Sequence, residues 1–302
     1  MLKEFVRGVL YKTGFTLVRH REISYMQKDF FDAKTWELEI MNKVSDFTML
    51  SHEKIFNLIS GVQYIVKNNI EGAIVECGVA RGGAMMSVAK TLKKLNVKDR
   101  ELYLYDIFYP GMPPGCTYDK TADGEDVNQL IKHAGIVYDK RNKIDIEQKC
   151  TLNGVKKLLS YSKYPKEKIF FIKGMVEDTI PNIIPEKVSI LRLDTDFYKS
   201  TKHELEYLFP RLQRGGILII DDYGVLEGSK KATDEYLQKK GISLFLNRVD
   251  NSGCRVGVKI WESFHMYNFS IIIPSCGRDS LIKCLKKVQK AIQRIDYVKF
   301  QI

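Results

Sequence analysis

The chain has 302 residues, 44% of them hydrophobic, and its 48 basic against 37 acidic side chains give a formal net charge of +11. This length allows one large domain with appendages, but no apolar run reaches the roughly 18 residues of a membrane helix, and no secretory signal peptide is visible. Residues 1–21 and 262–302 each carry a net charge of +4, so the middle of the chain is nearly balanced. We therefore expect no nucleic-acid partner for the central part.

The six cysteines show neither paired nor zinc-binding spacing, which predicts reduced thiols in a cytoplasmic protein. Residues 2–18 have the pattern of a short amphipathic helix with basic residues on its polar face. This segment is a candidate for peripheral contact with the inner membrane surface, or for packing on its own domain or on a partner subunit. We assign residues 1–44 to an N-terminal helical extension and expect a homo-oligomer.

From residue 49 onward the chain alternates between helix and strand patterns. A helix is expected over 49–68, with Ser51 as its cap, and further helices over 84–95 and 230–239. The expected strands are 73–77, 101–106, 169–173, 189–194, 216–221, 243–248 and 255–260. This alternation predicts an α/β, Rossmann-like fold with a mostly parallel seven-stranded sheet and helices on both faces.

We assign residues 45–262 to this domain. A long insertion, residues 110–168, separates the second and third expected strands and is rich in Gly, Pro, Asp and Lys over its first part. Such an insertion is either a lid over a binding site or a surface loop.

Acidic residues end two of the expected strands, in segments 191–196 and 217–224. If these strands are parallel neighbours, Asp194, Asp221 and Asp222 meet at one sheet edge. Carboxylates at such short range repel each other, so one must take a proton or a cation must lie between them. Ligands that are all oxygen atoms favour a hard ion such as Mg²⁺. A helix cap or a surface turn is the alternative.

A glycine-rich turn, residues 78–83, follows the first strand and precedes a helix, as in sites where a ligand approaches the backbone. Asp106 ends the second strand, where an acidic residue can bond ribose hydroxyls. Glu76 suits a ligand with an ammonium group and a sulfonium charge better than a pyrophosphate. This favours S-adenosylmethionine over NAD, although Glu76 could instead cap the turn.

The chain resembles the macrocin O-methyltransferase (TylF-type) family, whose Mg²⁺-dependent members transfer a methyl group from S-adenosylmethionine to sugar hydroxyls. The resemblance covers roughly residues 45 to 260. The matching stretches are Thr48-Met49 with Ser51 and Glu53, Val75-Glu76-Cys77-Gly78-Val79 with Arg81-Gly82-Gly83, Glu177-Asp178-Thr179-Ile180-Pro181, Leu191-Arg192-Leu193-Asp194-Thr195-Asp196 with Tyr198 and Ser200-Thr201, and Pro210-Arg211-Leu212 through Gly215-Gly216 to Asp221-Asp222-Tyr223-Gly224.

The resemblance implies a class I methyltransferase fold, with Asp194, Asp221 and Asp222 as Mg²⁺ ligands and Asp196 as the general base. The implied cofactor-binding residues are Thr48, Met49, Ser51, Glu76, Gly78, Arg81, Gly82, Gly83, Asp106 and Asp178. Asp196 could instead be a fourth ligand, or a carboxylate that bonds a ligand, and Arg81 could form a structural ion pair. The Ser and Glu that commonly follow Asp106 in the family are absent here.

The expected function is methyl transfer to a sugar hydroxyl in polysaccharide, glycolipid or secondary-metabolite biosynthesis. Two alternatives stay open: an O-methyltransferase of the same fold that acts on a catechol-like molecule, and a non-catalytic protein that retains the cofactor fold. Residues 263–302 resemble the first strand and helix of a family-2 glycosyltransferase domain, although an ordinary C-terminal extension would also fit.

Overall fold

The computed structural model describes residues 29–109, 111–137 and 150–261. The expected helix over 2–18 and the glycosyltransferase-like tail lie outside these residues, so membrane contact and the nature of the tail stay predictions. Among the described helices, none is both long and apolar enough to cross a membrane.

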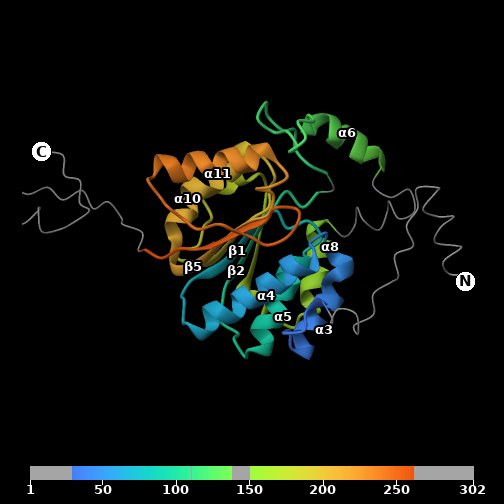
Figure 1. Ribbon diagram of the computed structural model, residues 1–302. Coiled ribbons are helices and arrows are strands. Elements are labelled where there is room, and N and C mark those ends of the chain that lie inside the picture. Colours follow the sequence, from blue (N-terminus) through green and yellow to red (C-terminus); the bar gives the residue numbers. More distant parts are fainter. Residues whose placement is uncertain (1–28, 110, 138–149, 262–302) are drawn as a thin grey trace, which may run out of the picture. The chain divides into compact units, whose positions relative to one another are not determined.

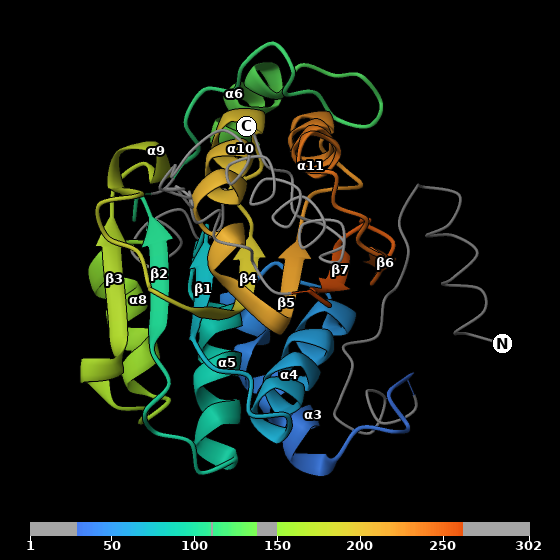
Figure 2. The same cartoon turned by 90° about the vertical axis from the view of Figure 1, so that its left-hand side faces the viewer.

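Seven strands form one sheet in the order β3-β2-β1-β4-β5-β7-β6. They are β1 (Ala73–Cys77), β2 (Leu102–Asp106), β3 (Ile169–Lys173), β4 (Val188–Leu193), β5 (Leu212–Ile220), β6 (Asn247–Arg248) and β7 (Arg255–Val258). Strands β1 to β5 are parallel, and β7 runs antiparallel to β5, as the arrows in Figure 2 show. The predicted mostly parallel, seven-stranded sheet is confirmed.

The strand order reverses between β1 and β4. The chain moves outward from β1 through β2 to β3, then returns to place β4 on the other side of β1. In open α/β sheets, ligands bind beyond the carboxyl ends of the strands at such a reversal. The topology therefore locates the candidate site at the ends of β1, β4 and β5.

Helices cover both faces of the sheet, as predicted (Figure 1). One layer contains α3 (Thr35–Val44), α4 (His52–Lys67), α5 (Gly83–Lys94) and α8 (Leu152–Ser160). The other contains α9 (Val176–Thr179), α10 (Tyr198–Tyr207) and α11 (Glu227–Lys239). Because both faces are covered, every residue of β1 and of β4 is buried, which is why these strands are nearly continuous apolar runs.

Helix α4 forms where its sequence pattern predicts it. The five apolar residues whose helical spacing predicts it are all buried: Ile55, Leu58, Ile59, Val62 and Ile65. Ser51 caps the helix by accepting a hydrogen bond from the backbone N–H of Lys54 at 3.2 Å. Helix α3 packs against α4 and α5 in the same core.

Strand β6 is shorter than the expected 243–248, because it pairs with β7 only through Asn247 and Arg248. It lies at the edge of the sheet that the described strands form. Conversely, β5 begins at Leu212, earlier than expected, with an irregular register beside β4.

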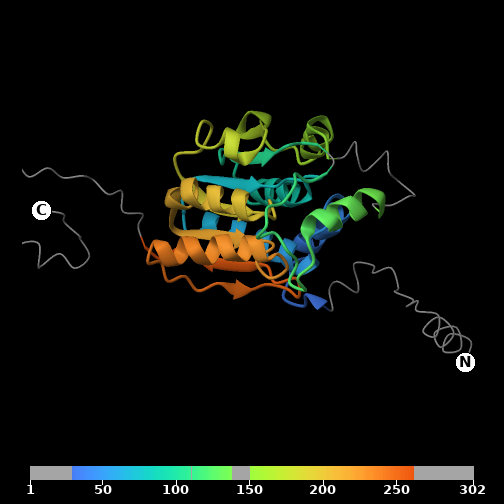
Figure 3. The same ribbon diagram turned by 90° about the horizontal axis from the view of Figure 1, so that it is seen from above.

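Within the described residues, the insertion contains two α-helices that the sequence pattern did not predict, α6 (Val127–Val137) and α8 (Leu152–Ser160). Helix α8 packs in the core beside α5, so this end of the insertion is neither a lid nor a surface loop. Helix α6 lies above the carboxyl ends of the strands in Figure 2 and beyond the ends of α10 and α11 in Figure 3. Just before it, buried Asp119 accepts a hydrogen bond at 2.7 Å from the backbone N–H of Tyr198, in the first turn of α10. The backbone N–H of Glu227 also bonds Lys120 O at 2.8 Å. This part of the insertion is thus held on the loops that follow β4 and β5.

The contact of Gly78 with the backbone of Asp194 can be tested by substitution. Its φ is +85°, and an added Cβ would overlap the carbonyl oxygen of Asp194. Gly124 has almost the same φ, +87°, but open space around it, so it is a matched control. We expect Gly124→Ala to lower the free energy of unfolding by about 1–2 kcal/mol, because only the backbone conformation is strained.

Gly78→Ala should lower the free energy of unfolding by at least about 3 kcal/mol, because backbone overlap adds to the same strain. Urea unfolding of both variants measures the difference. Equal losses would show that the contact between Gly78 and Asp194 has no energetic weight.

Candidate active site

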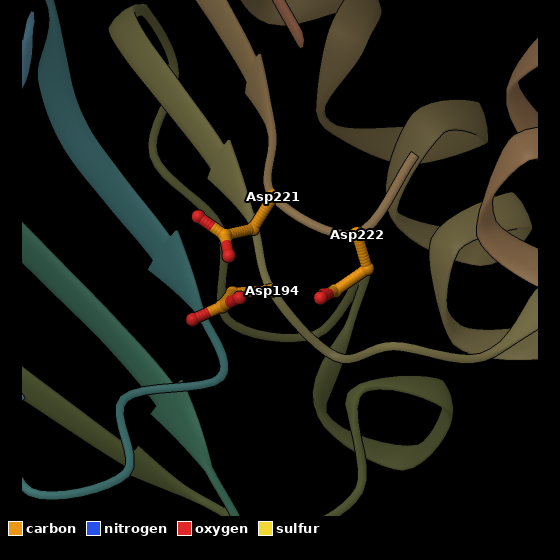
Figure 4. A group of neighbouring side chains, drawn as sticks. All are labelled: Asp194, Asp221 and Asp222. Atoms are coloured by element: carbon orange, nitrogen blue, oxygen red, sulfur yellow. The ribbon is translucent and has the colours of Figure 1, made fainter. Parts of the chain in front are cut away.

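Three acidic side chains meet at the carboxyl ends of β4 and β5. Ligand atoms of Asp194, Asp221 and Asp222 all lie within 4.8 Å of one another, and Figure 4 shows the three side chains converging. Backbone hydrogen bonds keep the ends of β1, β4 and β5 side by side. The N–H of Asp194 donates to Cys77 O at 2.8 Å, and the N–H of Asp221 donates to Leu193 O at 3.0 Å. The expected juxtaposition is therefore present in the structure.

A single buried guanidinium group connects three strands at this edge. Arg192, on β4, donates from Nη1 to Glu76 at 2.8 Å and to Asp194 at 2.7 Å. Its Nη2 donates to Asp221 Oδ1 at 2.7 Å. Arg192, Glu76 and Asp221 are each at most 5% exposed, so little water screens these pairs.

A second cation reaches the cluster from α4. The Lys54 ammonium donates to Asp221 Oδ2 at 2.6 Å and lies 4.0 Å from Asp250, in the turn between β6 and β7. Both carboxylate oxygens of Asp221 therefore accept a bond from a positive group. Burial raises the pKa of Asp221, but the charges of Arg192 and Lys54 outweigh it and hold that pKa below its usual value.

The negative charges of the other two carboxyl groups, Asp194 and Asp222, are balanced less fully by neighbouring positive groups. Burial and the nearby negative charges of Asp221 and Asp222 raise the pKa of Asp194 well above its usual value, although the positive charge of Arg192 lowers it. Burial also raises the pKa of Asp222, together with its neighbour Asp196. The cluster thus holds more carboxylates than its two bonded cations neutralise, so it favours an additional proton or cation.

The carboxyl group of Asp222 can take either of these. It bonds the side chain of Asp196, a contact that needs a proton between the two carboxyl groups, and its Oδ2 is buried and accepts no hydrogen bond within the part of the chain that the structure describes. A buried carboxylate oxygen without a partner is costly unless a ligand bonds it. Together with the all-oxygen donor set, it makes the three aspartates suitable for a hard divalent cation.

Asp196 lies on the loop after β4 in an uncommon conformation. Its φ of +69° is in the left-handed region, where residues other than glycine are rare and often functional. Burial, opposed by a bond with Asp222, raises the pKa of Asp196 to about 7. A carboxylate that titrates near neutral pH can accept a proton from a substrate, and its position beside Asp222 is also compatible with a bond to a metal ligand.

The glycine-rich turn is braced by Asp106. Its carboxylate accepts bonds from the backbone N–H groups of Val79 and Ala80, at 2.7 and 2.9 Å, and of Phe108 at 2.6 Å. Thus Asp106 shapes the turn itself, and its contact with a ribose stays a prediction. An added Cβ at Gly83 would overlap Phe47 and Thr48, so the segment before α4 lies directly on this turn.

The remaining predicted cofactor residues differ in their surroundings. Glu76 is buried and faces Arg192, and its Oε2 accepts no bond among the described residues. Burial, opposed by Arg192, raises its pKa to about 7. Ser51 bonds Asp250 at 2.9 Å, and Met49 is 67% exposed. Asp178 is exposed in α9, and Arg81 lies beside Cys150.

Sequence reasoning missed three members of this network: Arg192, Lys54 and Asp250. Arg192 had a visible signal, because it is a charged residue inside an otherwise apolar strand. Lys54 and Asp250 had none, because their proximity to Asp221 arises only when α4 and the β6–β7 turn pack against the sheet.

Glu204 supports the Asp196 loop from α10. It is fully buried, and its Oε1 accepts a hydrogen bond from the Thr195 hydroxyl at 2.8 Å, whereas its Oε2 has no partner among the described residues. Burial raises the pKa of Glu204 to about 8, opposed by the bond with Thr195 and reinforced by the charge of Glu177. The loop that carries Asp196 therefore rests on a carboxyl group that favours its protonated form.

Comparison with known proteins places this geometry in context. The profile of the family described as Macrocin-O-methyltransferase (TylF) matches residues 6–256. Demethyldecarbamoylnovobiocin O-methyltransferase of Streptomyces niveus is 29% identical over 255 residues, 81% of this chain and 88% of the relative.

A second relative, from Streptomyces olivaceus, is 8-demethyl-8-(2,3-dimethoxy-alpha-L-rhamnosyl)-tetracenomycin-C 4'-O-methyltransferase. It is 29% identical over 208 residues, 68% of this chain and 73% of the relative. Among solved structures, the O-methyltransferase NovP superposes with a TM-score of 0.60 at 27% identity, covering 71% of this chain and 83% of NovP.

Removal of the central guanidinium should destabilise the protein strongly. We expect Arg192→Met to lower the free energy of unfolding by about 3–5 kcal/mol, because it leaves buried carboxylates without their counter-ion. The control is Arg214→Met at an exposed position on β5, expected within about 0.5 kcal/mol of the unchanged protein. If urea unfolding gave similar values for the two variants, Arg192 would not hold the cluster together.

Glu204 should make stability depend on pH. Its folded-state pKa is raised, so its contribution is present below the ordinary Glu value near 4.5 and is lost as the pH rises toward 8. Glu204→Gln cannot titrate. Relative to the unchanged protein, this variant should gain about 2–4 kcal/mol in unfolding free energy between pH 5 and pH 8.

Glu206→Gln, at an exposed position on the same helix, is the matched control and should change little. Denaturant unfolding at pH 5, 6.5 and 8 measures both variants. The same pH dependence in both would contradict a buried, protonated Glu204.

Proposed function

Because the chain belongs to the macrocin O-methyltransferase (TylF) family, we propose that it transfers a methyl group from S-adenosylmethionine to a sugar hydroxyl with the help of a divalent cation. The family match confirms the predicted resemblance and the prediction of an O-methyltransferase, and the seven-stranded sheet agrees with a class I methyltransferase fold. The metal, the acceptor and the role of each residue belong to the proposal.

The convergence of Asp194, Asp221 and Asp222 beside the glycine-rich turn is the observation that carries this proposal. It brings an all-oxygen cation site next to a backbone turn suited to a small ligand. The two parts touch, because the Cα of Gly78 lies against the carbonyl group of Asp194. A methyl donor on the turn and an acceptor at the carboxylates would therefore be neighbours, and such positioning is a large part of catalysis.

The chain's own residues have separate proposed tasks. Asp194, Asp221 and Asp222 hold the cation, preferably Mg²⁺, which when bound lowers the pKa of a coordinated hydroxyl. Asp196, with a pKa of about 7, accepts the hydroxyl proton. The methyl group of S-adenosylmethionine is already activated as part of a sulfonium, so no other activation of the donor is needed.

The cofactor is proposed to bind between the turn and the segment before α4. Thr48 borders the turn on one side, Met49 and Ser51 follow it in the chain, and Asp106 supports the turn from β2. Glu76, with one buried oxygen that has no described partner, can accept a bond from the amino group of the methionine part. The same site also includes Gly78, Arg81, Gly82, Gly83 and Asp178.

The proposal of a sugar acceptor draws on the relatives. The name of the Streptomyces olivaceus relative includes a rhamnosyl group in the compound that this relative methylates. We infer a glycoside or nucleotide sugar as the acceptor class.

Calorimetric titration tests this function. We expect the unchanged protein to bind S-adenosylhomocysteine at micromolar strength and to bind Mg²⁺ reversibly, with EDTA removing the ion. Asp221→Asn should weaken Mg²⁺ binding by at least about tenfold and abolish methyl transfer to a panel of glycosides and nucleotide sugars, because it removes a ligand charge. S-adenosylhomocysteine affinity should stay within about threefold, because Asp221 is not a cofactor residue.

Asp99→Asn, exposed on the loop before β2, is the matched control and should keep both affinities. Absence of S-adenosylhomocysteine binding in the unchanged protein would exclude the methyltransferase reaction. Turnover that persists in EDTA and in Asp221→Asn would exclude the cation from it.

A further inference from the structure

Lys54 is a cation built into the carboxylate cluster. Its side chain is only 10% exposed, and its ammonium group donates to Asp221 Oδ2 at 2.6 Å. The other oxygen of Asp221 is bonded by Arg192 at 2.7 Å. A divalent ion that bonds Asp221 must therefore share an oxygen with one of these groups or displace it.

Lys54 is the more replaceable of the two groups. Arg192 donates to three carboxylates at once, from the interior of β4. Lys54 makes one short bond, from the first turn of α4, and has a second carboxylate, Asp250, only 4.0 Å away. Its ammonium group can thus move to Asp250 without losing contact with a negative charge.

We propose that Lys54 is a resident counter-ion of this site, which competes with the divalent cation for Asp221 and thereby weakens cation binding. This inference rests on the proposed function, because it takes the three aspartates as the cation site. Lys54 is a positioning residue in this role, since it acts on the cation through Asp221. It keeps the carboxylates compatible with one another when the ion is absent.

The positive charge of Lys54 determines the direction of its effect on cation affinity. A positive group within a few ångströms of a divalent ion repels it, and the repulsion is strong where water is largely excluded. Loss of Lys54 also loses one bond that orients Asp221. That loss is smaller, because Arg192 still bonds Oδ1 and the backbone N–H of Asp221 still bonds Leu193. The charge effect should therefore dominate.

The test is Mg²⁺ titration by calorimetry of the full chain, first stripped with EDTA. Lys54→Met keeps the length of the side chain but removes the charge, and we expect it to bind Mg²⁺ about tenfold more tightly. Lys54→Arg retains the charge and should stay within about twofold. Lys187→Met is the matched control, because Lys187 pairs with Glu71 on an exposed surface and its loss should leave Mg²⁺ affinity unchanged.

A second readout separates this role from a merely structural one. S-adenosylhomocysteine affinity should change less than about threefold in Lys54→Met, because Ser51 still bonds Asp250 and still caps α4. Unchanged or weaker Mg²⁺ binding in Lys54→Met would overturn the inference, and so would loss of both ligands. If the unchanged protein binds S-adenosylhomocysteine but no Mg²⁺, the proposed metal site fails, and the competition fails with it.

Discussion

The candidate site depends on one buried guanidinium group. Arg192 bonds carboxylates that belong to three neighbouring strands, Glu76 on β1, Asp194 after β4 and Asp221 after β5. Parallel strands bring their carboxyl ends together, and here that geometry would concentrate unscreened negative charge in the protein interior. A buried ion pair contributes little net stability in general, but removal of one partner is costly. The arginine therefore makes this acidic sheet edge possible, whatever ligand completes it.

The same packing joins the glycine-rich turn to the acidic sheet edge. Gly78 lies against the carbonyl group of Asp194 with no room for a side chain, and Gly83 lies against the segment before α4. That segment leads through the Ser51 cap to Lys54 and so to Asp221. The turn, the start of α4 and the acidic loop thus form one continuous structure. A displacement of any one of these segments would shift the others, since close-packed interiors transmit strain.

The loop that carries Asp196 is supported from two sides. Glu204 holds Thr195 from within α10, and Asp119 of the insertion caps the first turn of that helix. Asp196 keeps its left-handed conformation inside this frame. Strained backbone persists only where its surroundings determine it, and such residues concentrate at functional sites. The part of the insertion that contains Asp119 therefore contributes to the shape of the site, in addition to any role as a cover.

The hydrophobic periodicity of the sequence, and the acidic residues at the ends of two strands, were enough to predict the sheet, helix α4 and the group of three aspartates. These features depend on local pattern and on the rule that parallel strands align their carboxyl ends. Residue spacing could not reveal that Asp106 braces the turn, or that Lys54 and Asp250 approach Asp221. Those contacts join segments far apart in the chain and depend on how helices and loops pack on the sheet. Tertiary structure alone decided which charges compensate the aspartates, because electrostatic compensation depends on distance in space and burial, and neither is encoded in local sequence.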